Sequence, residues 1–298
     1  MASFSKLSEC VYQYNDAATV PHPKATDEMR NDFEKNGFVI IRNVFNEVEL
    51  DKLHTAITNW QPLFDSQFSL KDTDRRSYDV SEWHDPGSDI LGRTAGNAKT
   101  VGVAEQLLNQ GELYMYSGKM IMKPGKTGGT IHWHQDYGYW YNNRAPYPHF
   151  ITCLIGFTRS DRHNGGLQVI KGSHRLGRID HIKQAGQTCA DIERVQLVQK
   201  LLPTVNVDLA PGDCVMFHGN MLHTSGPNES DEKRWNLIFS YNARINSPDR
   251  HHYNACYGEH TLHRFDAHAL QTCEDLKCHE REGDHLNPAD NPNVAIEP

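Results

Sequence analysis

Residues 131–137 read Ile-His-Trp-His-Gln-Asp-Tyr, and this stretch decides how the rest of the chain is interpreted. It follows a β-rich run at residues 113–122. In a β-strand alternate side chains share a face, so a strand here would direct His132, His134 and Asp136 to one side. Two imidazoles and a carboxylate on one face make a poor apolar core and a good set of metal ligands. The stretch therefore predicts a metal site on a sheet.

A second histidine-rich stretch, residues 215–226, is expected to bring a distal ligand to the same site. It contains His223, and Ser225 follows two residues later on the same expected strand face. Arg234 lies eleven residues beyond His223 and opens another β-like run. Because arginine binds carboxylates through two parallel hydrogen bonds, Arg234 and the Ser225 hydroxyl could hold the far carboxylate of a keto acid whose other end chelates the metal.

Two ligand sets are open from these residues alone. His132, His134 and His223 would form an all-histidine site of the cupin type, suited to zinc or manganese. His134, Asp136 and His223 would form a facial triad, which suits Fe(II) because its open positions accept a bidentate co-substrate and then dioxygen. We favour the triad, because its charge suits Fe(II) and because a serine and an arginine accompany the distal histidine.

The composition is that of an ordinary globular protein and excludes several classes of function. The chain has 298 residues, of which 38% are hydrophobic and 23% charged. Its net charge of -8 argues against a broad basic surface for nucleic acid. No apolar run approaches the roughly 20 residues that span a bilayer, and the N-terminus lacks the apolar segment of a secretory signal. Seven scattered cysteines are unlike a disulfide framework. We therefore expect a cytoplasmic protein, monomeric or homodimeric, with no nucleic-acid or membrane partner.

The residue pattern predicts a chain that is mainly β with flanking helices, organised as a single domain over residues 1–298. Its N-terminal part, residues 26–60, should hold a helix that begins at the cap residue Thr26 and ends at Gly37, then a strand, then a second helix capped by Asn46. Short strands separated by turn signals should fill the core at about 113–245, as in a sandwich or barrel. The predicted strands cover residues 113–122, 130–137, 151–157, 167–171, 205–209, 214–218 and 235–242.

Three segments fall outside this pattern. Residues 61–100 are polar and irregular, so we expect surface loops there, with one of them covering the site. Residues 176–202 should form a partly helical excursion, and both segments are candidate lids. Residues 246–298 form a C-terminal extension, which should be extended or disordered beyond about residue 284.

With these motifs in place, the chain resembles the phytanoyl-CoA dioxygenase (PhyH) family of Fe(II)- and 2-oxoglutarate-dependent oxygenases. The resemblance rests on His-Gln-Asp at 134–136 with the distal His223, Ser225 and Arg234, and on three flanking segments. These segments are DFEKNGFVIIRNVF (32–45), NGGLQVIKGSH (164–174) and LAPGDCVMFHGNMLHTSGPN (209–228). Residues 123–140, KPGKTGGTIHWHQDYGYW, are most similar to the ectoine-hydroxylase branch of the family.

The resemblance implies a double-stranded β-helix, the cupin-like jelly roll, that binds Fe(II) through His134, Asp136 and His223. It also implies 2-oxoglutarate as co-substrate, bound by Arg234 and Ser225, and consumption of O2 with release of succinate and CO2. Related halogenases are expected to carry glycine or alanine where this chain has Asp136, so the carboxylate favours hydroxylation. The implied substrate is a small polar molecule, such as an amino acid or related zwitterion.

Six further residues are candidates for binding, each with a structural alternative. Two residues on one face of the preceding strand could reach 2-oxoglutarate, or else have an ordinary sheet-face role: Lys119 and Ser117. Four residues in or after the motif could contact substrate, or else serve as core aromatics, a structural histidine or a solvated loop charge: Trp140, Tyr137, His132 and Arg144.

Other outcomes remain open at this level. The same cofactor chemistry could give oxidative cyclisation or desaturation, or act on an acyl-CoA. A non-catalytic β-helix binding protein and a cupin-like metal isomerase are the alternatives from other classes. His132→Ala and Asp136→Ala separate the two ligand sets, because only one of the two residues is a ligand in each.

Overall fold

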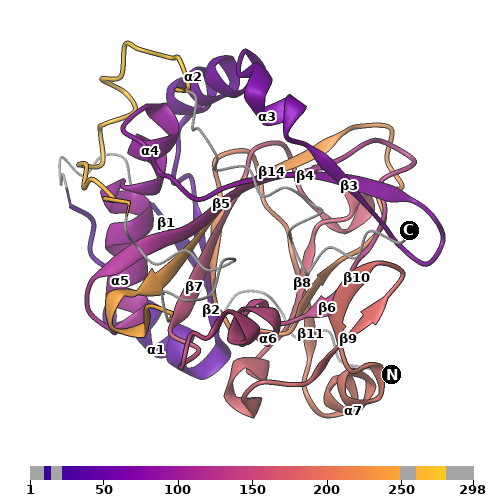
Figure 1. The fold of residues 1–298 in the computed structure, drawn as a ribbon. Coiled ribbons are helices and arrows are strands. Elements are labelled where there is room, and N and C mark those ends of the chain that lie inside the picture. Colours follow the sequence, from indigo (N-terminus) through magenta and orange to yellow (C-terminus); the bar gives the residue numbers. More distant parts are fainter. Residues whose placement is uncertain (1–9, 15–21, 249–259, 280–298) are drawn as a thin grey trace.

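Two β-sheets face one another at the centre of the molecule (Figure 1). This computed structural model describes residues 10–14, 22–248 and 260–279. The larger sheet has eight strands, in the order β1 (Val11–Gln13), β2 (Phe38–Arg42), β12 (Cys214–His218), β7 (Phe150–Gly156), β14 (Arg234–Ala243), β5 (Leu113–Lys123), β4 (Ser77–Trp83) and β3 (Phe68–Lys71). The smaller has four, in the order β11 (Thr204–Val207), β8 (Leu167–Ile170), β13 (His223–Ser225) and β6 (Ile131–His134).

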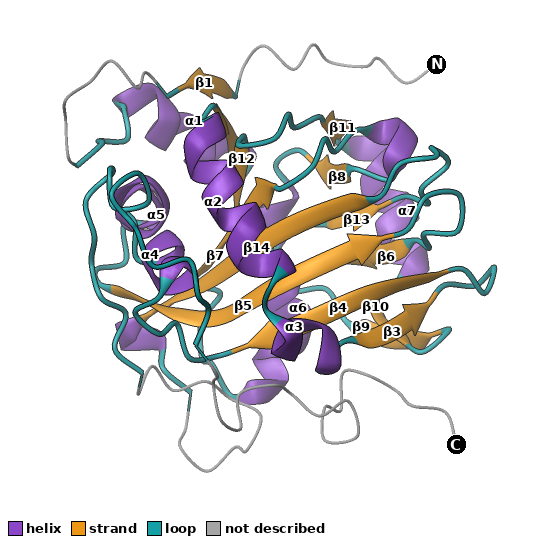
Figure 2. Ribbon diagram, turned by 90° about the horizontal axis from the view of Figure 1, so that it is seen from above, coloured by secondary structure: helices purple, strands orange, loops and turns teal. Residues whose placement is uncertain are grey.

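The order in which the chain visits the two sheets defines the fold. β5, β7, β12 and β14 lie in the larger sheet, whereas β6, β8, β11 and β13 lie in the smaller one. The chain therefore crosses between the sheets after almost every strand of this set. Figure 2 shows β14, β5 and β4 running side by side, as their antiparallel pairing requires. This is a double-stranded β-helix, and the predicted mainly-β jelly roll with flanking helices is confirmed.

Helices cover the outer face of the larger sheet (Figure 1): α1 (Asp27–Asn36), α2 (Glu47–Thr58), α4 (Ile90–Ala95) and α5 (Val103–Leu108). Their apolar residues and those of the sheet form the largest core cluster. The predicted caps are confirmed. Thr26 accepts from the backbone N–H of Met29, and Gly37 ends α1 at φ 84°, in the left-handed region that glycine favours. Asn46 begins α2 in a capping box with Glu49.

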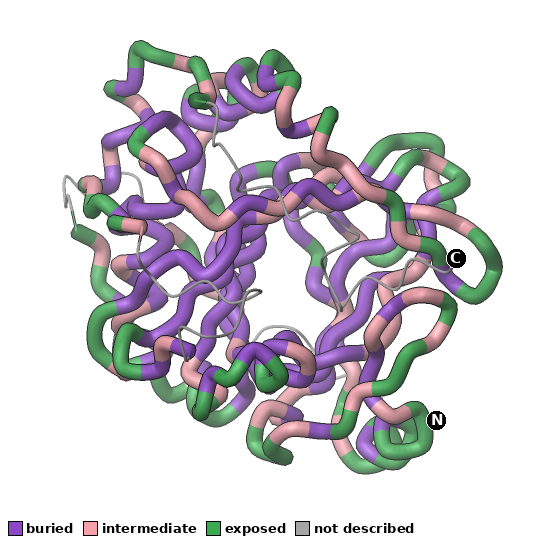
Figure 3. Tube along the Cα trace, viewed as in Figure 1, coloured by how far each residue is buried: buried purple, intermediate pink, exposed green. Residues whose placement is uncertain are grey.

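A second core cluster lies between the two sheets. It contains Phe38, Leu154, Val169, Val207 and Val215, from both sheets. Leu154 and Phe217 of this cluster also line the candidate site, where polar side chains of β5, β14, β6 and β13 meet. Figure 3 shows that the strands are largely buried, while exposed residues gather on loops and outer helix turns.

The remaining elements surround this frame. α6 (Asp136–Trp140) follows β6 directly, and a hairpin of β9 (His181–Gln184) and β10 (Gln187–Ala190) precedes α7 (Ile192–Leu201). The helical excursion predicted for residues 176–202 is thus confirmed in its second half, and the hairpin in its first half was missed. Shorter helical pieces are α3 (Gln61–Asp65), a π-helix (Ala98–Gly102) and 3-10 turns at Tyr141–Asn143, Arg162–Asn164, Ser173–Leu176 and Arg244–Asn246.

Two sequence-based predictions were wrong about local structure. Residues 61–100 are not simply surface loops, because they contain α3, β3, β4 and α4, and residues 79–83 of β4 pair with β5. In β4 the inward-facing Tyr78 and Val80 alternate with polar residues. Because few apolar residues occur in this segment, its sequence does not show the pattern expected of a strand. Residues 215–226 are not one strand but two in different sheets, β12 and β13, separated by a turn at residues 219–222.

The other predicted strands are confirmed, with ends that shift by at most two residues, except for the one at residues 130–137. That strand, β6, ends at His134, and Asp136 is the first residue of α6. The predicted disorder beyond residue 284 lies outside the described residues. No helix in the described part of the chain is long and apolar enough to cross a membrane.

Candidate active site

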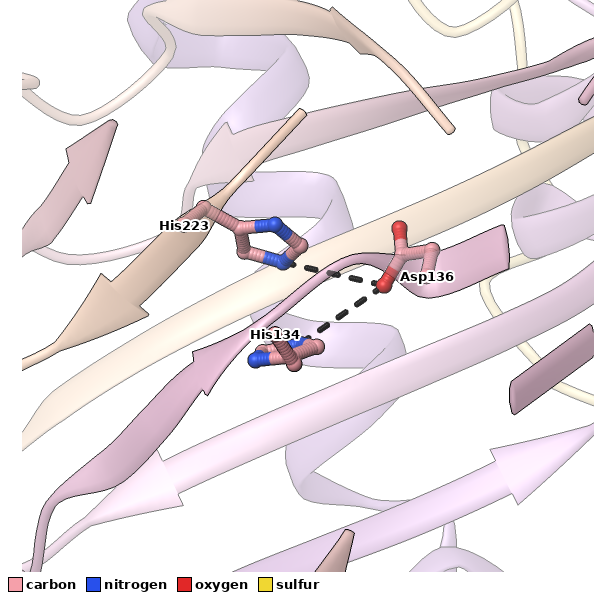
Figure 4. A group of neighbouring side chains, drawn as sticks. All are labelled: His134, Asp136 and His223. Carbon is pink, nitrogen blue, oxygen red and sulfur yellow. Dashed lines mark ion pairs between the residues drawn. The ribbon is translucent and has the colours of Figure 1, made fainter. Parts of the chain in front are cut away.

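His134, Asp136 and His223 converge on one point between the sheets (Figure 4). Their potential ligand atoms all lie within 4.8 Å of one another, and no other such group occurs among the residues that the structure describes. His134 and His223 are direct cross-strand partners on β6 and β13, and their ring centroids are 4.0 Å apart. The Asp136 Oδ1 lies 3.7 Å from Nε2 of His134 and 3.6 Å from Nε2 of His223. These separations are too long for good hydrogen bonds and suit atoms that share a cation.

Hydrogen bonds to the backbone fix the tautomer of both imidazoles. The Nδ1–H of His134 donates to the carbonyl of His132 at 2.7 Å, and that of His223 donates to the carbonyl of Met221 at 2.9 Å. In the neutral form of each ring, Nε2 therefore carries the lone pair that a metal ligand needs. Burial, and then the neighbouring His223, lower the pKa of His134 to about 3, so this ring is neutral at pH 7.

Two hydroxyl groups orient the carboxylate of Asp136. Thr152 donates to Oδ2 at 2.8 Å, and Tyr139 donates to Oδ1, the oxygen that faces both histidines, at 2.9 Å. Burial alone would raise the pKa of Asp136, but His223, His134, Lys119 and the Thr152 hydroxyl together lower it below its ordinary value. The group is therefore ionised, and its two oxygens are held in distinct environments.

Gln135 places Asp136 beside the histidines although Asp136 has left the strand. Its side-chain amide donates to the carbonyls of Gly177 and Asn220, each at 2.8 Å, and its oxygen accepts from the N–H of Ile179 at 2.7 Å. Its own N–H donates to Nε2 of His181 at 3.0 Å. The chain thus turns from β6 into α6 at a fixed point. The three ligands meet for this reason and not through strand alternation, which the sequence had suggested.

Arg234 and Lys123 place two buried cations near the triad. Arg234 Nη2 donates to Ser225 Oγ at 3.2 Å, and Nη1 donates to the side-chain oxygen of Asn236 at 2.5 Å. Lys123 Nζ donates to Ser225 Oγ at 2.7 Å and to the carbonyls of Ser225 and Gly226. The Ser225 hydroxyl donates in turn to the carbonyl of Gly165 at 2.6 Å, so it links the two cations.

These cations lack an anionic partner among the described residues. Burial, and then the charge of Arg234, hold the pKa of Lys123 well below its ordinary value. Burial lowers the pKa of Arg234 to about 10. The Arg234 Nε is buried and has no hydrogen-bond partner in the described residues. Desolvated charge of one sign is costly unless an anion pairs with it, so this end of the site fits a carboxylate ligand.

Two adjoining pockets open from the triad. The first, here the arginine pocket, is lined by Lys119, Ile121, Ile131, His134, Asp136, Tyr139, Thr152, Leu154, Leu167, Phe217, His223, Thr224, Ser225, Arg234, Asn236, Ile238 and Ser240. The second, here the Glu82 pocket, is lined by Phe68, Leu70, Tyr78, Val80, Glu82, His84, Tyr116, Lys119, Ile121, Ile131, His134, Tyr139, Trp140, Asn143, Gln187 and Thr188. They share a wall that includes His134, Tyr139 and Lys119, so a metal at the triad would face both.

The structure brings some of the predicted binding residues to these pockets. Trp140 lines the Glu82 pocket, and Lys119 lines both. Ser225 and Arg234 line the arginine pocket. Ser117 lies opposite Ser240 in the β5–β14 pairing but lines neither pocket, and its buried hydroxyl has no partner among the described residues.

Three predicted substrate residues are not at the pockets, and each has a structural reason. Tyr137 packs in an aromatic cluster with Phe150, and its hydroxyl donates to the carbonyl of Ala145 at 3.1 Å. His132 is the second residue of β6, lines neither pocket and lies outside the triad; burial lowers its pKa, and the charge of Asp72 opposes that shift. Arg144 is exposed, in the turn after α6.

Sequence reasoning missed three residues that the structure places at the site. They are Tyr139, which contacts Asp136, Lys123, which contacts Ser225, and Glu82, which pairs with Lys119 at 3.2 Å. Tyr139 lies three residues after Asp136, a spacing that puts both on one face of a helix, but α6 was not predicted. No local signal marks the other two.

The donor set fits a non-haem iron. Two imidazoles and one carboxylate on one face of a cation form the facial triad typical of Fe(II) oxygenases, and they leave the opposite face open. The cationic end of the arginine pocket fits a second carboxylate at a distance from the metal.

Comparisons with known proteins agree with this arrangement. Residues 33–235 match the model of the family described as Phytanoyl-CoA dioxygenase (PhyH). An ectoine dioxygenase of Bordetella bronchiseptica is 26% identical over 313 aligned positions, which cover 94% of this chain and 97% of that protein. The L-proline trans-4-hydroxylase of Streptomyces griseoviridis is 30% identical over 164 positions, covering 50% of this chain and 61% of that one.

The fold of this chain is also similar to that of solved structures. The structure of EctD from S. alaskensis with bound Fe has a TM-score of 0.63 at 23% identity and covers 82% of this chain and 84% of its own. EctD with 2-oxoglutarate and 5-hydroxyectoine has a TM-score of 0.62 at 22% identity, with the same coverage. At these identities the likeness establishes the fold.

Proposed function

This chain belongs to the phytanoyl-CoA dioxygenase (PhyH) family and is an Fe(II)- and 2-oxoglutarate-dependent dioxygenase. From that premise we propose that it hydroxylates an unactivated C–H bond of a small zwitterion such as an amino acid. The observation that carries the proposal is the opening of one facial triad onto two pockets of different chemistry. One pocket presents cations for a keto acid, and the other is free for substrate.

His134, Asp136 and His223 would hold the iron. When bound, Fe(II) supplies the redox chemistry by which O2 decarboxylates 2-oxoglutarate to succinate and CO2 while the substrate is oxidised. A backbone carbonyl accepts from Nδ1 of each histidine and so orients the opposite ring nitrogen, Nε2, toward the position that the metal would occupy. Hydrogen bonds from Thr152 and Tyr139 orient the Asp136 carboxylate. Both features reduce the reorganisation that metal binding requires.

The arginine pocket would take 2-oxoglutarate. Arg234 would bind the far carboxylate, since its buried Nε lacks a partner within the described chain. Lys123 does not line the pocket, but it donates to the Ser225 hydroxyl, which lines the pocket and also accepts from Arg234. Apolar side chains such as Leu154, Phe217 and Ile238 would contact the methylene groups and exclude water. In this arrangement the Ser225 oxygen accepts from both cations, while its hydroxyl donates to the carbonyl of Gly165.

The Glu82 pocket would hold the substrate beside the open face of the metal. Trp140 and Tyr139 form aromatic walls, and Asn143, Gln187 and Thr188 add neutral polar groups. Such a surface suits a compact molecule with both polar and apolar parts. The names of the similar proteins, ectoine dioxygenase and L-proline trans-4-hydroxylase, support a small nitrogen-containing substrate.

Succinate release from a substrate panel tests the proposal. Purified enzyme with Fe(II), ascorbate and 2-oxoglutarate is incubated with free amino acids, cyclic zwitterions, fatty acids and acyl-CoA thioesters. We expect substrate-dependent succinate only with zwitterions, together with a product that has gained one oxygen atom. A product that has lost two hydrogens would indicate desaturation or cyclisation instead. Activity on an uncharged lipid or an acyl-CoA, with none on amino acids, contradicts the proposed substrate class.

A further inference from the structure

Glu82 and Lys119 form an ion pair inside the Glu82 pocket. They are register partners on the neighbouring strands β4 and β5, and Lys119 Nζ lies 3.2 Å from Glu82 Oε1. Their side chains are only 10% and 17% exposed, and both line the pocket. Most ion pairs on a sheet face solvent, whereas this one faces a ligand cavity next to the triad.

The neighbours of the pair place it close to the reacting centre. Lys119 Nζ lies 5.6 Å from the centroid of the Trp140 ring, so the indole supports the ammonium group. The charge of Lys119 helps to lower the pKa of Asp136, after the effects of burial and the two histidines. The charge of Glu82 adds to the rise in the pKa of Tyr139, which burial and Asp136 dominate. Both charges therefore act at the metal end of the pocket.

The pocket is balanced in charge. Among the described residues that line it, Glu82 is the only carboxylate and Lys119 the only lysine or arginine, while the rest are apolar, aromatic, histidine or neutral polar residues. A ligand with a net charge would pair with one of these two residues and leave the other largely buried and unpaired, which costs free energy. A ligand that carries both charges can exchange partners with the pair and leave no charge uncompensated.

We propose that the Glu82–Lys119 ion pair selects the substrate, which is a zwitterion whose cationic group binds Glu82 and whose anionic group binds Lys119. The inference rests on the proposed function and deepens it, because it names the two residues that recognise the substrate and its orientation. The aromatic face of Trp140 lies beside the anion position, and the carbon skeleton lies between the charges, next to the triad. Glu82 is then a specificity determinant that lines the substrate pocket alone, apart from the arginine pocket.

Ligand sets matched in carbon skeleton test the inference without turnover. The probes are L-proline, pyrrolidine and cyclopentanecarboxylate, and in a second set 4-aminobutyrate, butylamine and butyrate. Binding to the anaerobic Fe(II)–2-oxoglutarate enzyme is measured by calorimetry. We expect the zwitterion to bind at least about tenfold more tightly than its amine and its acid, because each of these loses one charge-assisted contact. Equal or tighter binding of an amine or an acid overturns the inference, as does a lack of binding by both zwitterions.

Single substitutions should switch the preference, which a merely structural ion pair would not do. Glu82→Gln leaves Lys119 unpaired, so zwitterion binding should weaken about tenfold and acid binding should strengthen. Lys119→Met should favour the amine instead. Glu229→Gln is the matched control, because it breaks the exposed Arg76–Glu229 ion pair outside both pockets. An unchanged order of ligands in Glu82→Gln contradicts the inference.

The two proposals fail in different ways. If the enzyme forms no complex with Fe(II) and 2-oxoglutarate, the proposed function fails before any substrate is added. If that complex forms and hydroxylation occurs on a substrate whose affinity is the same in Glu82→Gln and wild type, only the role of the ion pair fails.

Discussion

Replacing Lys123 with methionine should separate the charge requirements of 2-oxoglutarate binding from those of the fold. Lys123 is fully buried, and its three hydrogen bonds end on Ser225 and Gly226. Methionine fills a similar volume without charge. The variant keeps Arg234 but removes the second cation at that end of the arginine pocket.

The size of the effect follows from the position of the ammonium group. It acts on the ligand through the Ser225 hydroxyl and also holds that hydroxyl against Arg234. We therefore assign it about 1.5 kcal/mol, the lower end for a hydrogen bond to a charged group, which is about tenfold in Kd for 2-oxoglutarate. Arg234→Met removes the direct contact and should cost about 3 kcal/mol, or more than a hundredfold.

The pH dependence has a definite sign. In the protein without ligand, burial and Arg234 hold the pKa of Lys123 well below its ordinary value of 10.5. A bound dianion raises that pKa, so binding is favoured by the protonated form. Affinity should be greatest below the ligand-free pKa and should fall as pH rises through it. In Lys123→Met this part of the pH dependence is absent.

Calorimetric titration of the anaerobic Fe(II) enzyme with 2-oxoglutarate, at several pH values and in buffers of different ionisation enthalpy, measures both effects. Lys126→Met, in the exposed turn that follows, is the control. Without ligand, Lys123→Met should be at least as thermally stable as wild type, because a desolvated charge has been removed. An unchanged Kd with an unchanged pH dependence would refute the role of Lys123.

Three further predictions concern the triad and its surroundings. Asp136→Ala should abolish iron-dependent succinate release, measured by chromatography, and an active variant would favour the all-histidine alternative. Tyr139→Phe removes the donor to Oδ1 and should weaken Fe(II) binding about tenfold, measured by anaerobic titration, while thermal stability stays close to wild type. His132→Ala and Tyr137→Phe should both spare succinate release. Tyr137→Phe should in addition lower the free energy of unfolding, measured by denaturant titration, by about 1 kcal/mol, because it removes the hydrogen bond to the Ala145 carbonyl. A loss of turnover in either variant would place that residue at the site.

The histidines and the fold could be predicted because their signals are local. His134 and His223 each lie in a short histidine-rich segment, although the strands expected around them were too long, because β6 ends at His134 and residues 215–226 form two strands. The caps Thr26, Gly37 and Asn46 depend on neighbouring residues only, and all three were correct. A short segment of sequence contains the physical cause of each of these features.

The residues that were missed depend on strand register and on turns that tertiary contacts fix. Glu82 reaches the site because β4 pairs with β5, and the polar character of residues 61–100 hid that strand. Lys123 precedes a Pro-Gly turn and looks like a surface lysine, yet the end of β5 is buried against β13. Asp136 does lie beside His134 and His223, but not for the reason that the sequence suggested, since long-range contacts of Gln135 set its position.

The measurement that tests the central claim most directly is an anaerobic titration of the metal-free protein with Fe(II) and then 2-oxoglutarate. The account predicts the weak visible charge-transfer band of a chelated keto acid at one equivalent of iron. It also predicts that Arg234→Met needs a much higher 2-oxoglutarate concentration to reach the same band. Iron binding without a band would contradict the account, and so would a band that Arg234→Met leaves unchanged.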